Sequence, residues 1–247
     1  MEGSVRLEKK NNIGRIHFYH PKGNSLPSAL LKQLVQTFQA ADKDPEIRVI
    51  ILESQGKAFC AGASLSELKK VKTPEEGTAF FMGFARLLNT LRSLSKFVLA
   101  RVHGKVVGGG VGLVSACDYA FATEASMIKL SELSIGIGPY VIEPAVSRKI
   151  GATAFAQLSL DSAQWKTAQW GLDKGLYAEC VSNIESLDRI LNEKAKTFAA
   201  YAPEACHELR KLHWKNTQDW ENLLPQNAKI TGRLALSDFS QKKIKSL

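Results

Sequence analysis

The spacing of apolar residues predicts a hairpin followed by a helix at the start of the chain. Residues 5–9 and 13–19 alternate weakly between apolar and polar positions on either side of Asn11-Asn12, as the strands of a hairpin do. Pro27 then suits the first turn of a helix. The apolar positions that recur at helical spacing after it are Leu30, Leu31, Leu34, Val35, Phe38 and Ala41. Asp44-Pro45 ends this helix, because proline disfavours the helical conformation of the residue before it.

Two nearly continuous apolar runs, at 48–53 and 97–102, predict buried strands. Each run leads into a loop of small residues and then into a helix. We expect helices at 64–72 and 75–95 after the first run, and a helix rich in small residues through Cys117 after the second.

Further along the chain the pattern becomes mainly helical. Short strands are expected at 119–123 and 127–130. From about residue 141 helices dominate, with one more strand at 178–182.

A strand–turn–helix unit recurs at irregular spacing, at 13–43, 48–72 and 97–117. Strands that alternate with helices imply an α/β core. We therefore expect a core domain at 1–189 and a smaller helical C-terminal domain at 190–247.

Length and composition are those of an ordinary globular protein. A chain of 247 residues is long enough for one large core with a helical appendage. No apolar run approaches the roughly 20 residues that a membrane span needs. The first residues carry no signal-peptide pattern, so we expect a cytoplasmic protein without a membrane partner.

The charge of the chain suggests what kind of partner it binds, and its cysteines bear on metal sites and disulfides. Lys and Arg number 33 against 24 Asp and Glu, and this net charge of +9 suggests an anionic partner. Nucleic acid and a phosphorylated cofactor both qualify, and composition does not distinguish them. The cysteines are Cys60, Cys117, Cys180 and Cys206. They are far apart and form no CxxC pair, so we expect buried free thiols and no metal site or disulfide.

Two glycine-containing loops, each between a predicted strand and a predicted helix, are the most informative segments. In the first, at 59–65, Gly62 lets the backbone approach a ligand closely, although a tight turn without a ligand would use the same residues. In the second, at 102–112, three consecutive glycines weaken the helix that follows, which close packing or a close substrate would offset. A P-loop is excluded because no Lys-Ser or Lys-Thr follows these glycines. A dinucleotide fingerprint is excluded because Ser115 stands where glycine or alanine is needed.

The two loops together resemble the crotonase (enoyl-CoA hydratase/isomerase) superfamily. The matching strings are GKAFCAGASLSEL at 56–68 and HGKVVGGGVGLVSACDYAFAT at 103–123. NSL at 24–26 and KLSELSIGIGP at 129–139 match as well, and the four motifs occur in the family's order. The resemblance implies a crotonase-type spiral of repeated ββα units with a C-terminal helical trimerisation domain, assembled as a homotrimer or hexamer.

The resemblance also implies an oxyanion hole for the thioester of an acyl-CoA. In the family, its two donors are the amide after AG in the first loop and the amide of the middle glycine of GGG. These positions are Ala63 and Gly109 in this chain. Two amides placed on the thioester oxygen favour the enolate, and one such donor is typically worth about 10²–10³ in rate.

Coenzyme A is expected as the carrier of the substrate, with no permanently bound cofactor and no metal. By resemblance, the residues beside it are Ser25, Leu26, Ala61, Ala63, Leu65, Gly109, Lys242 and Lys243. The two lysines match basic residues that family members place beside the CoA phosphates. The alternative for the Lys242–Lys245 cluster is a solvated tail.

The chain departs from the hydratases of the family at one of their two glutamates. The position two residues after GGG is Gly112, which cannot transfer a proton. The second glutamate is retained as Glu132, and burial near an acyl chain would raise its pKa toward neutrality, as a general acid or base requires. The alternative for Glu132 is a carboxylate at a helix start.

Four nearby positions bear on the substrate. Tyr140 and Glu143 follow Glu132 closely and are candidates for a second polar group. Ser64 and Ser131 replace an aspartate and a proline that are usual in the family. Both changes concern the substrate and leave the expected fold unchanged.

The sequence therefore predicts an enoyl-CoA hydratase or Δ3,Δ2-enoyl-CoA isomerase with Glu132 as general acid and base. One carboxylate fits an isomerase well, because a single base removes and returns the same proton. Alternatives are a decarboxylase or a hydratase of a branched, methylglutaconyl-type enoyl-CoA on the same scaffold. A non-catalytic RNA-binding member is a further alternative, but the chain carries no RRM or KH signature, so nucleic acid is not the expected partner.

Overall fold

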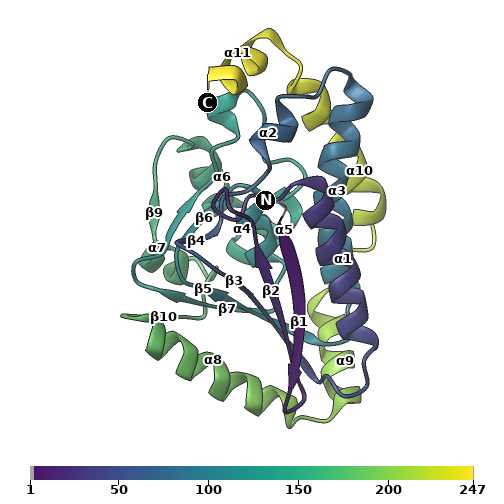
Figure 1. Ribbon diagram of the computed structural model, residues 1–247, viewed down its shortest axis with the longest axis vertical. Coiled ribbons are helices and arrows are strands. Elements are labelled where there is room, and N and C mark those ends of the chain that lie inside the picture. The colour runs from purple at the N-terminus through teal and green to yellow at the C-terminus, as the bar shows by residue number, and fades with distance from the viewer. Residues whose placement is uncertain (1–2, 247) are drawn as a thin grey trace.

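The predicted N-terminal hairpin forms one edge of a six-stranded sheet in the computed structural model, which describes residues 3–246 (Figure 1). The strand order is β1-β2-β3-β5-β7-β10, and every pair after the antiparallel β1 and β2 is parallel. These strands are β1 (Ser4–Lys10), β2 (Ile13–Tyr19), β3 (Val49–Ser54), β5 (Phe97–Val102), β7 (Tyr119–Thr123) and β10 (Glu179–Val181). Every residue of β3 is buried, which explains its nearly continuous apolar sequence.

The sequence pattern does not predict the second, four-stranded sheet, whose order is β4-β6-β8-β9. Its strands are β4 (Ala58–Cys60), β6 (Lys105–Val107), β8 (Met127–Lys129) and β9 (Lys166–Thr167). β4 and β6 lie in segments predicted as loops, because strands of three residues leave no readable periodicity. Each of β4, β6 and β8 directly follows a strand of the first sheet. The pairs β3–β4, β5–β6 and β7–β8 thus alternate between the sheets, which confirms the predicted α/β spiral.

The helices mostly follow the predicted positions. They are α1 (Ser28–Lys43), α2 (Leu65–Leu68), α3 (Pro74–Ser93), α4 (Gly109–Ser115), α5 (Glu143–Ile150), α6 (Ala152–Leu160), α7 (Ala168–Asp173), α8 (Ile184–Ala199), α9 (Pro203–His213), α10 (Trp220–Leu234) and α11 (Asp238–Ser246), with a 3₁₀ turn η1 (Leu133–Ile135). The helix predicted at 64–72 is only the single turn α2. Ser64 caps its start by accepting a hydrogen bond from the Glu67 amide.

Helices cover both faces of the first sheet (Figure 1). α1, α3 and α10 lie side by side on one side, and α8 crosses the other face against β3, β5 and β7. Gly77 of α3 and Gly232 of α10 bring these two helices into backbone contact, since a Cβ on Gly77 would lie 2.8 Å from the Gly232 Cα. This close crossing brings α10 beside the cavity described below.

The boundary expected between residues 189 and 190 falls inside α8. This helix buries Leu187 and Leu191 against the first sheet, and Asp188 accepts a 2.5 Å hydrogen bond from Arg101 Nε on β5. α8 is therefore packed as a layer of the core, and the helices that follow it begin at Pro203. The two-domain division stays a prediction.

One buried arginine attaches α9 to the rest of the fold. Arg210 is 1% exposed and its Nε lies 3.0 Å from the Asp118 carboxylate. Its other nitrogens donate to the backbone oxygens of Leu91, Arg92 and Leu94 at the end of α3. Removing such a side chain would leave a buried carboxylate and three carbonyls without this partner.

The free thiols are only partly as expected. Cys60 and Cys117 are buried, whereas Cys180 and Cys206 are partly exposed. Within residues 3–246, no three His, Cys, Asp or Glu side chains gather in a way that could hold a metal ion. Over the same residues, no helix combines the length and hydropathy needed to span a bilayer.

Candidate active site

A cavity of about 340 Å³ lies where the two glycine loops meet the helices. The loops contribute residues 61–63 and 107–109 to its wall. Two phenylalanines come from α3, Thr231 comes from α10, and the segment between Lys129 and Ile142 supplies much of the remainder. Most of the lining side chains are apolar, so the cavity suits a hydrocarbon chain beside a small polar centre.

The first loop is held in place by the segment that precedes α1. Leu26 donates its amide hydrogen to the Gly62 oxygen at 2.8 Å, and Ala61 donates to the Gly23 oxygen at 3.0 Å. Gly62 has φ +81°, and a Cβ there would lie 2.8 Å from the backbone oxygen of Val107 in the second loop. Glycine is therefore required at this position both by its backbone conformation and by the close approach of the two loops.

The second loop turns into α4 directly under Glu132. Gly108 has φ +52°, and its amide donates to the Lys129 oxygen at 2.9 Å. A Cβ on Gly108 would lie 2.7 Å from Glu132 Oε1, so the carboxyl group sits against the bare backbone. At Gly109 a Cβ would overlap the ring of Phe84, so this ring packs directly against the backbone of the loop. The consecutive glycines thus make room for a carboxyl group and an aromatic ring.

Two backbone amides of the loops are free to bind a ligand. Ala63 and Gly109 both line the cavity, and neither N–H donates to an acceptor within residues 3–246. Free amides beside an apolar cavity are costly unless water or a ligand oxygen satisfies them. The structure therefore brings the two predicted donors to one cavity.

Glu132 supplies a carboxyl group to the cavity, whose lining also includes Lys129. Part of the residue is exposed, but its Oε2 is enclosed and accepts no hydrogen bond within the described chain. Burial raises the pKa of its carboxyl from 4.5 to about 7, and a hydrogen bond to its own backbone opposes this rise. A carboxyl with that pKa exchanges a proton readily near neutral pH.

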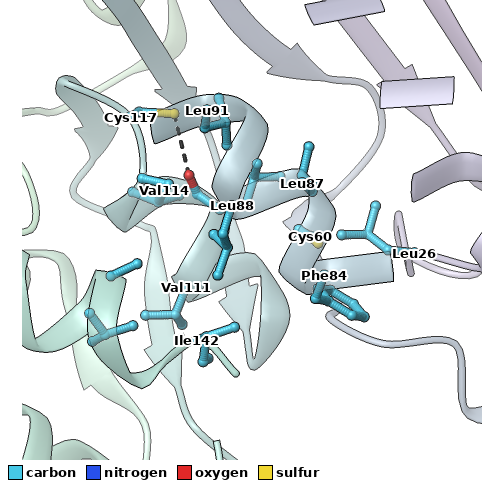
Figure 2. Packing of buried hydrophobic residues seen from close by; sticks show 14 of the residues in the cluster. Leu26, Cys60, Phe84, Leu87, Leu88, Leu91, Val111, Val114, Cys117 and Ile142 are labelled. Atoms are coloured by element: carbon cyan, nitrogen blue, oxygen red, sulfur yellow. Dashed lines mark hydrogen bonds between the residues drawn. The ribbon is translucent and has the colours of Figure 1, made fainter. Parts of the chain in front are cut away.

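The structure explains the glycine at position 112 by packing. A Cβ on Gly112 would lie 2.5 Å from Ile142 Cγ2 and 2.6 Å from Ile142 Cβ. Gly112 is buried, and Figure 2 shows Ile142 among the packed hydrophobic residues of the core. Hydrocarbon thus fills the space that a longer side chain at 112 would need, and no carboxylate fits there without moving Ile142.

The other predicted site residues divide into two groups. Ala61 and Leu65 line the cavity. Ser25 and Leu26 are buried beside the first loop but do not belong to the lining, and Ser25 Oγ lies 3.0 Å from His20 Nδ1.

Tyr140 and Glu143 take no place on the cavity wall. Glu143 accepts a 2.6 Å hydrogen bond from Ser147, and the Tyr140 ring packs against Gly138. Gly138 itself lines the cavity, and a role for Tyr140 or Glu143 as a second polar group stays a prediction. Lys242 and Lys243 are exposed on α11, outside the lining.

Several lining residues were not singled out from the sequence. Phe81 and Phe84 of α3, Ile142 before α5 and Thr231 of α10 all contact the cavity. The helical periodicity of α3 predicts that Phe81 and Phe84 are buried. It does not predict which of the buried residues face a cavity. Thr231 lies more than a hundred residues from the loops, and no local pattern connects it with them.

Comparison with known proteins agrees with this architecture. A sequence model described as enoyl-CoA hydratase/isomerase matches residues 8–246. The probable enoyl-CoA hydratase of Bacillus subtilis is 27% identical over 98% of this chain and 95% of its own length. The ethylmalonyl-CoA decarboxylase of Mus musculus is 30% identical over 85% of this chain and 66% of its own length. The crystal structure of an enoyl-CoA hydratase from Mycobacterium avium superposes with a TM-score of 0.87 at 26% identity, covering 100% of this chain and 96% of that one. The fold, the two glycine loops and the match along nearly the whole sequence establish that this chain belongs to the enoyl-CoA hydratase/isomerase family.

Proposed function

We propose that this chain is an enoyl-CoA isomerase in which Glu132 moves a proton between two carbons of the acyl chain. The observation that carries the proposal is the composition of the cavity: a buried carboxyl group with a pKa of about 7 shares it with two free backbone amides. The position of a second catalytic glutamate is Gly112, against which Ile142 packs. The apolar lining favours an uncharged acyl chain as the substrate.

In the proposed reaction, the thioester oxygen of a 3-enoyl-CoA accepts hydrogen bonds from the Ala63 and Gly109 amides. The Glu132 carboxylate takes a proton from C2, and the electron pair delocalises onto the thioester oxygen to give a dienolate. The two amides stabilise the new negative charge, each by about 10²–10³ in rate. Protonated Glu132 then gives the proton to C4. The double bond moves from C3–C4 to C2–C3, and no atom is gained or lost.

Water addition is disfavoured by the surroundings of Gly112. Hydration requires a water molecule held over C3 and a proton delivered to C2, a task that two carboxylates share in the hydratases the chain resembles. Gly112 offers no polar atom beyond its backbone, and the adjacent Ile142 is hydrocarbon. An ordered water would find few of the two to four polar partners it needs at that position.

The expected contacts with coenzyme A extend the proposal beyond the cavity. Ala61 and Leu65 lie on the cavity wall, where the carrier would enter past the first loop. Leu26 supports that loop through its hydrogen bond to Gly62, Ser25 is buried next to Leu26, and the exposed Lys242 and Lys243 on α11 are available to the CoA phosphates. A trimer or hexamer, formed through the C-terminal helices, belongs to the same proposal.

The direct experiment compares two isosteric variants. Purified protein is given a 3-enoyl-CoA, and the 2-enoyl product is followed by chromatography and mass spectrometry. Glu132→Gln keeps the shape of the side chain but cannot exchange the proton, so turnover should fall by about 10²-fold or more while acyl-CoA still binds. Glu143→Gln is the matched control, since Glu143 is outside the cavity lining. Full isomerase activity in Glu132→Gln would rule out the proposed role.

A second candidate is decarboxylation of a carboxyacyl-CoA. It is favoured by the similarity to the mouse ethylmalonyl-CoA decarboxylase and by the raised pKa of Glu132, which leaves a protonated fraction near neutral pH. Carbon dioxide would leave C2, the electron pair would form the enolate held by the two amides, and protonated Glu132 would protonate C2. Release of carbon dioxide from a 2-alkylmalonyl-CoA, without isomerisation of a 3-enoyl-CoA, would select this candidate.

A further inference from the structure

Cys60 lies at the junction of the two loops that carry the free amides. It is the last residue of β4, directly before the turn at Ala61 and Gly62 in the first loop, and its side chain is fully buried. Its Sγ accepts a hydrogen bond from the Gly62 amide at 3.4 Å. The thiol therefore restrains the first loop one residue before Ala63.

The same side chain contacts the second loop. A Cβ on Gly110 would lie 2.8 Å from Cys60 Cβ and 3.0 Å from Cys60 Sγ, so the bare backbone of Gly110 rests on the cysteine. Gly110 follows Gly109, whose amide is the second free donor. Figure 2 shows Cys60 among the buried hydrophobic residues, near Leu26 and Phe84.

The two loops also contact each other next to Cys60. A Cβ on Gly62 would lie 2.8 Å from the Val107 oxygen and 3.4 Å from the Gly109 nitrogen. The Gly62 backbone therefore lies so close to the second loop that no side chain fits between them. The first loop thus approaches the second in two ways, through the Cys60 side chain and through the backbone of Gly62.

We propose that Cys60 is a positioning residue, which sets the separation of the Ala63 and Gly109 amides and thereby their ability to bind one oxyanion. This proposal rests on the proposed function, because it takes these amides as the oxyanion hole. Sulfur suits the role because it reaches the Gly62 amide at a longer distance than an oxygen acceptor would. Burial also raises the pKa of the Cys60 thiol to about 12, so the group stays neutral beside the developing negative charge.

Cys117 provides a matched control for the loss of a buried thiol. It is also fully buried, burial raises its pKa to about 12, and its Sγ donates to the Leu113 oxygen at 3.3 Å (Figure 2). It follows α4, and within residues 3–246 its thiol forms no hydrogen bond with either loop. Cys117→Ala therefore removes a similar side chain without changing the contacts between the loops.

The test measures binding of two ligands to Cys60→Ala, Cys60→Ser and Cys117→Ala by calorimetry. One ligand is a saturated acyl-CoA, and the other is a 3-oxoacyl-CoA at alkaline pH, whose enolate places charge on the thioester oxygen. We expect both Cys60 variants to lose about tenfold or more in affinity for the enolate while binding the saturated ligand within about twofold of wild type, because small misplacements of catalytic groups cost up to 10²-fold. Cys117→Ala should show no such selective loss.

Gly110→Ala provides a second perturbation from the opposite side, since the added methyl pushes against Cys60. It should produce the same selective loss even where a Cys60 variant folds poorly. The positioning role would be overturned if the Cys60 and Cys117 variants bound the enolate with equal affinity and Gly110→Ala also lost no affinity for the enolate relative to the saturated ligand.

Failure of the positioning role of Cys60 can be distinguished from failure of the proposed function. If wild type isomerises a 3-enoyl-CoA and Glu132→Gln does not, the proposed function stands and an unselective Cys60 result refutes only the positioning role. If wild type binds no acyl-CoA at all, both are refuted together.

Discussion

Glu132→Gln should stabilise the protein while it abolishes turnover. The wild-type carboxyl group is enclosed among apolar residues and Oε2 has no hydrogen-bond partner within residues 3–246, so ionising it in the folded state is unfavourable. Glutamine has nearly the same shape and carries no charge at any pH. The variant therefore isolates the free-energy cost of one buried ionisation.

The magnitude follows from the pKa of Glu132. Burial raises that pKa from 4.5, its value in the unfolded chain, to about 7 in the fold, which corresponds to roughly 3 kcal/mol. Below pH 4.5 both states are protonated and the substitution should change stability little. As the pH rises through 4.5 to 7, the unfolded state ionises first, so wild-type stability declines relative to the variant. The advantage of Glu132→Gln should be about 1 kcal/mol at pH 5 and about 3 kcal/mol at pH 8.

Urea unfolding at the two pH values measures this difference. The midpoint of Glu132→Gln should exceed that of wild type by clearly more at pH 8 than at pH 5, with similar slopes. Glu143→Gln serves as the control, because its carboxyl accepts a hydrogen bond from Ser147 and lies outside the cavity lining. A stability difference between wild type and Glu132→Gln that does not change with pH would refute the reasoning.

Three other outcomes follow from the same structure. If ionised Glu132 is the base, kcat/KM for a 3-enoyl-CoA should rise with pH through about 7 and fall to roughly a tenth of its plateau at pH 6; a flat profile would contradict this. Gly112→Ala should cost about 1–3 kcal/mol in urea unfolding, because its Cβ would overlap Ile142. The cost should shrink in an Ile142→Ala background and disappear with Ile142→Gly, whereas equal costs in all backgrounds would disprove the contact. Arg210→Ala should cost about 3–5 kcal/mol in the same measurement, whereas Arg189→Ala, which breaks an exposed ion pair, should change stability by less than about 0.5 kcal/mol.

The parts of the fold predicted from sequence are those with a long or repeated pattern. The buried run of β3 and the helical spacing of α1 and α3 extend over enough residues to define their type and approximate ends. The second sheet could not be predicted in this way. β4 and β6 have three residues each, and they become strands only because the chain pairs them in space.

In the candidate site, too, some residues could be predicted from sequence motifs and others depend on contacts between distant segments. Ala63, Gly109 and Glu132 stand in motifs that follow the family's order, and the structure brings all three to one cavity. The reason for Gly112 was not visible in sequence, because it depends on Ile142, thirty positions further along. The expectation for Tyr140 rested on its nearness to Glu132 in sequence; its ring packs against Gly138 of the cavity wall, and its role stays a prediction. Contacts between distant segments decide which residues face a cavity, and a single sequence does not record them.

The role of Glu132 as a lone acid–base group is tested most directly in heavy water. Wild type is incubated with a 3-enoyl-CoA and, separately, with a 2-enoyl-CoA, and the product masses are determined. The proposed function predicts that the 3-enoyl-CoA becomes its 2-enoyl isomer with at most deuterium exchange, and that neither substrate gains a molecule of water. Addition of water to the 2-enoyl-CoA at a rate comparable to isomerisation would contradict it, and would mean that the site activates water without a second carboxylate at position 112.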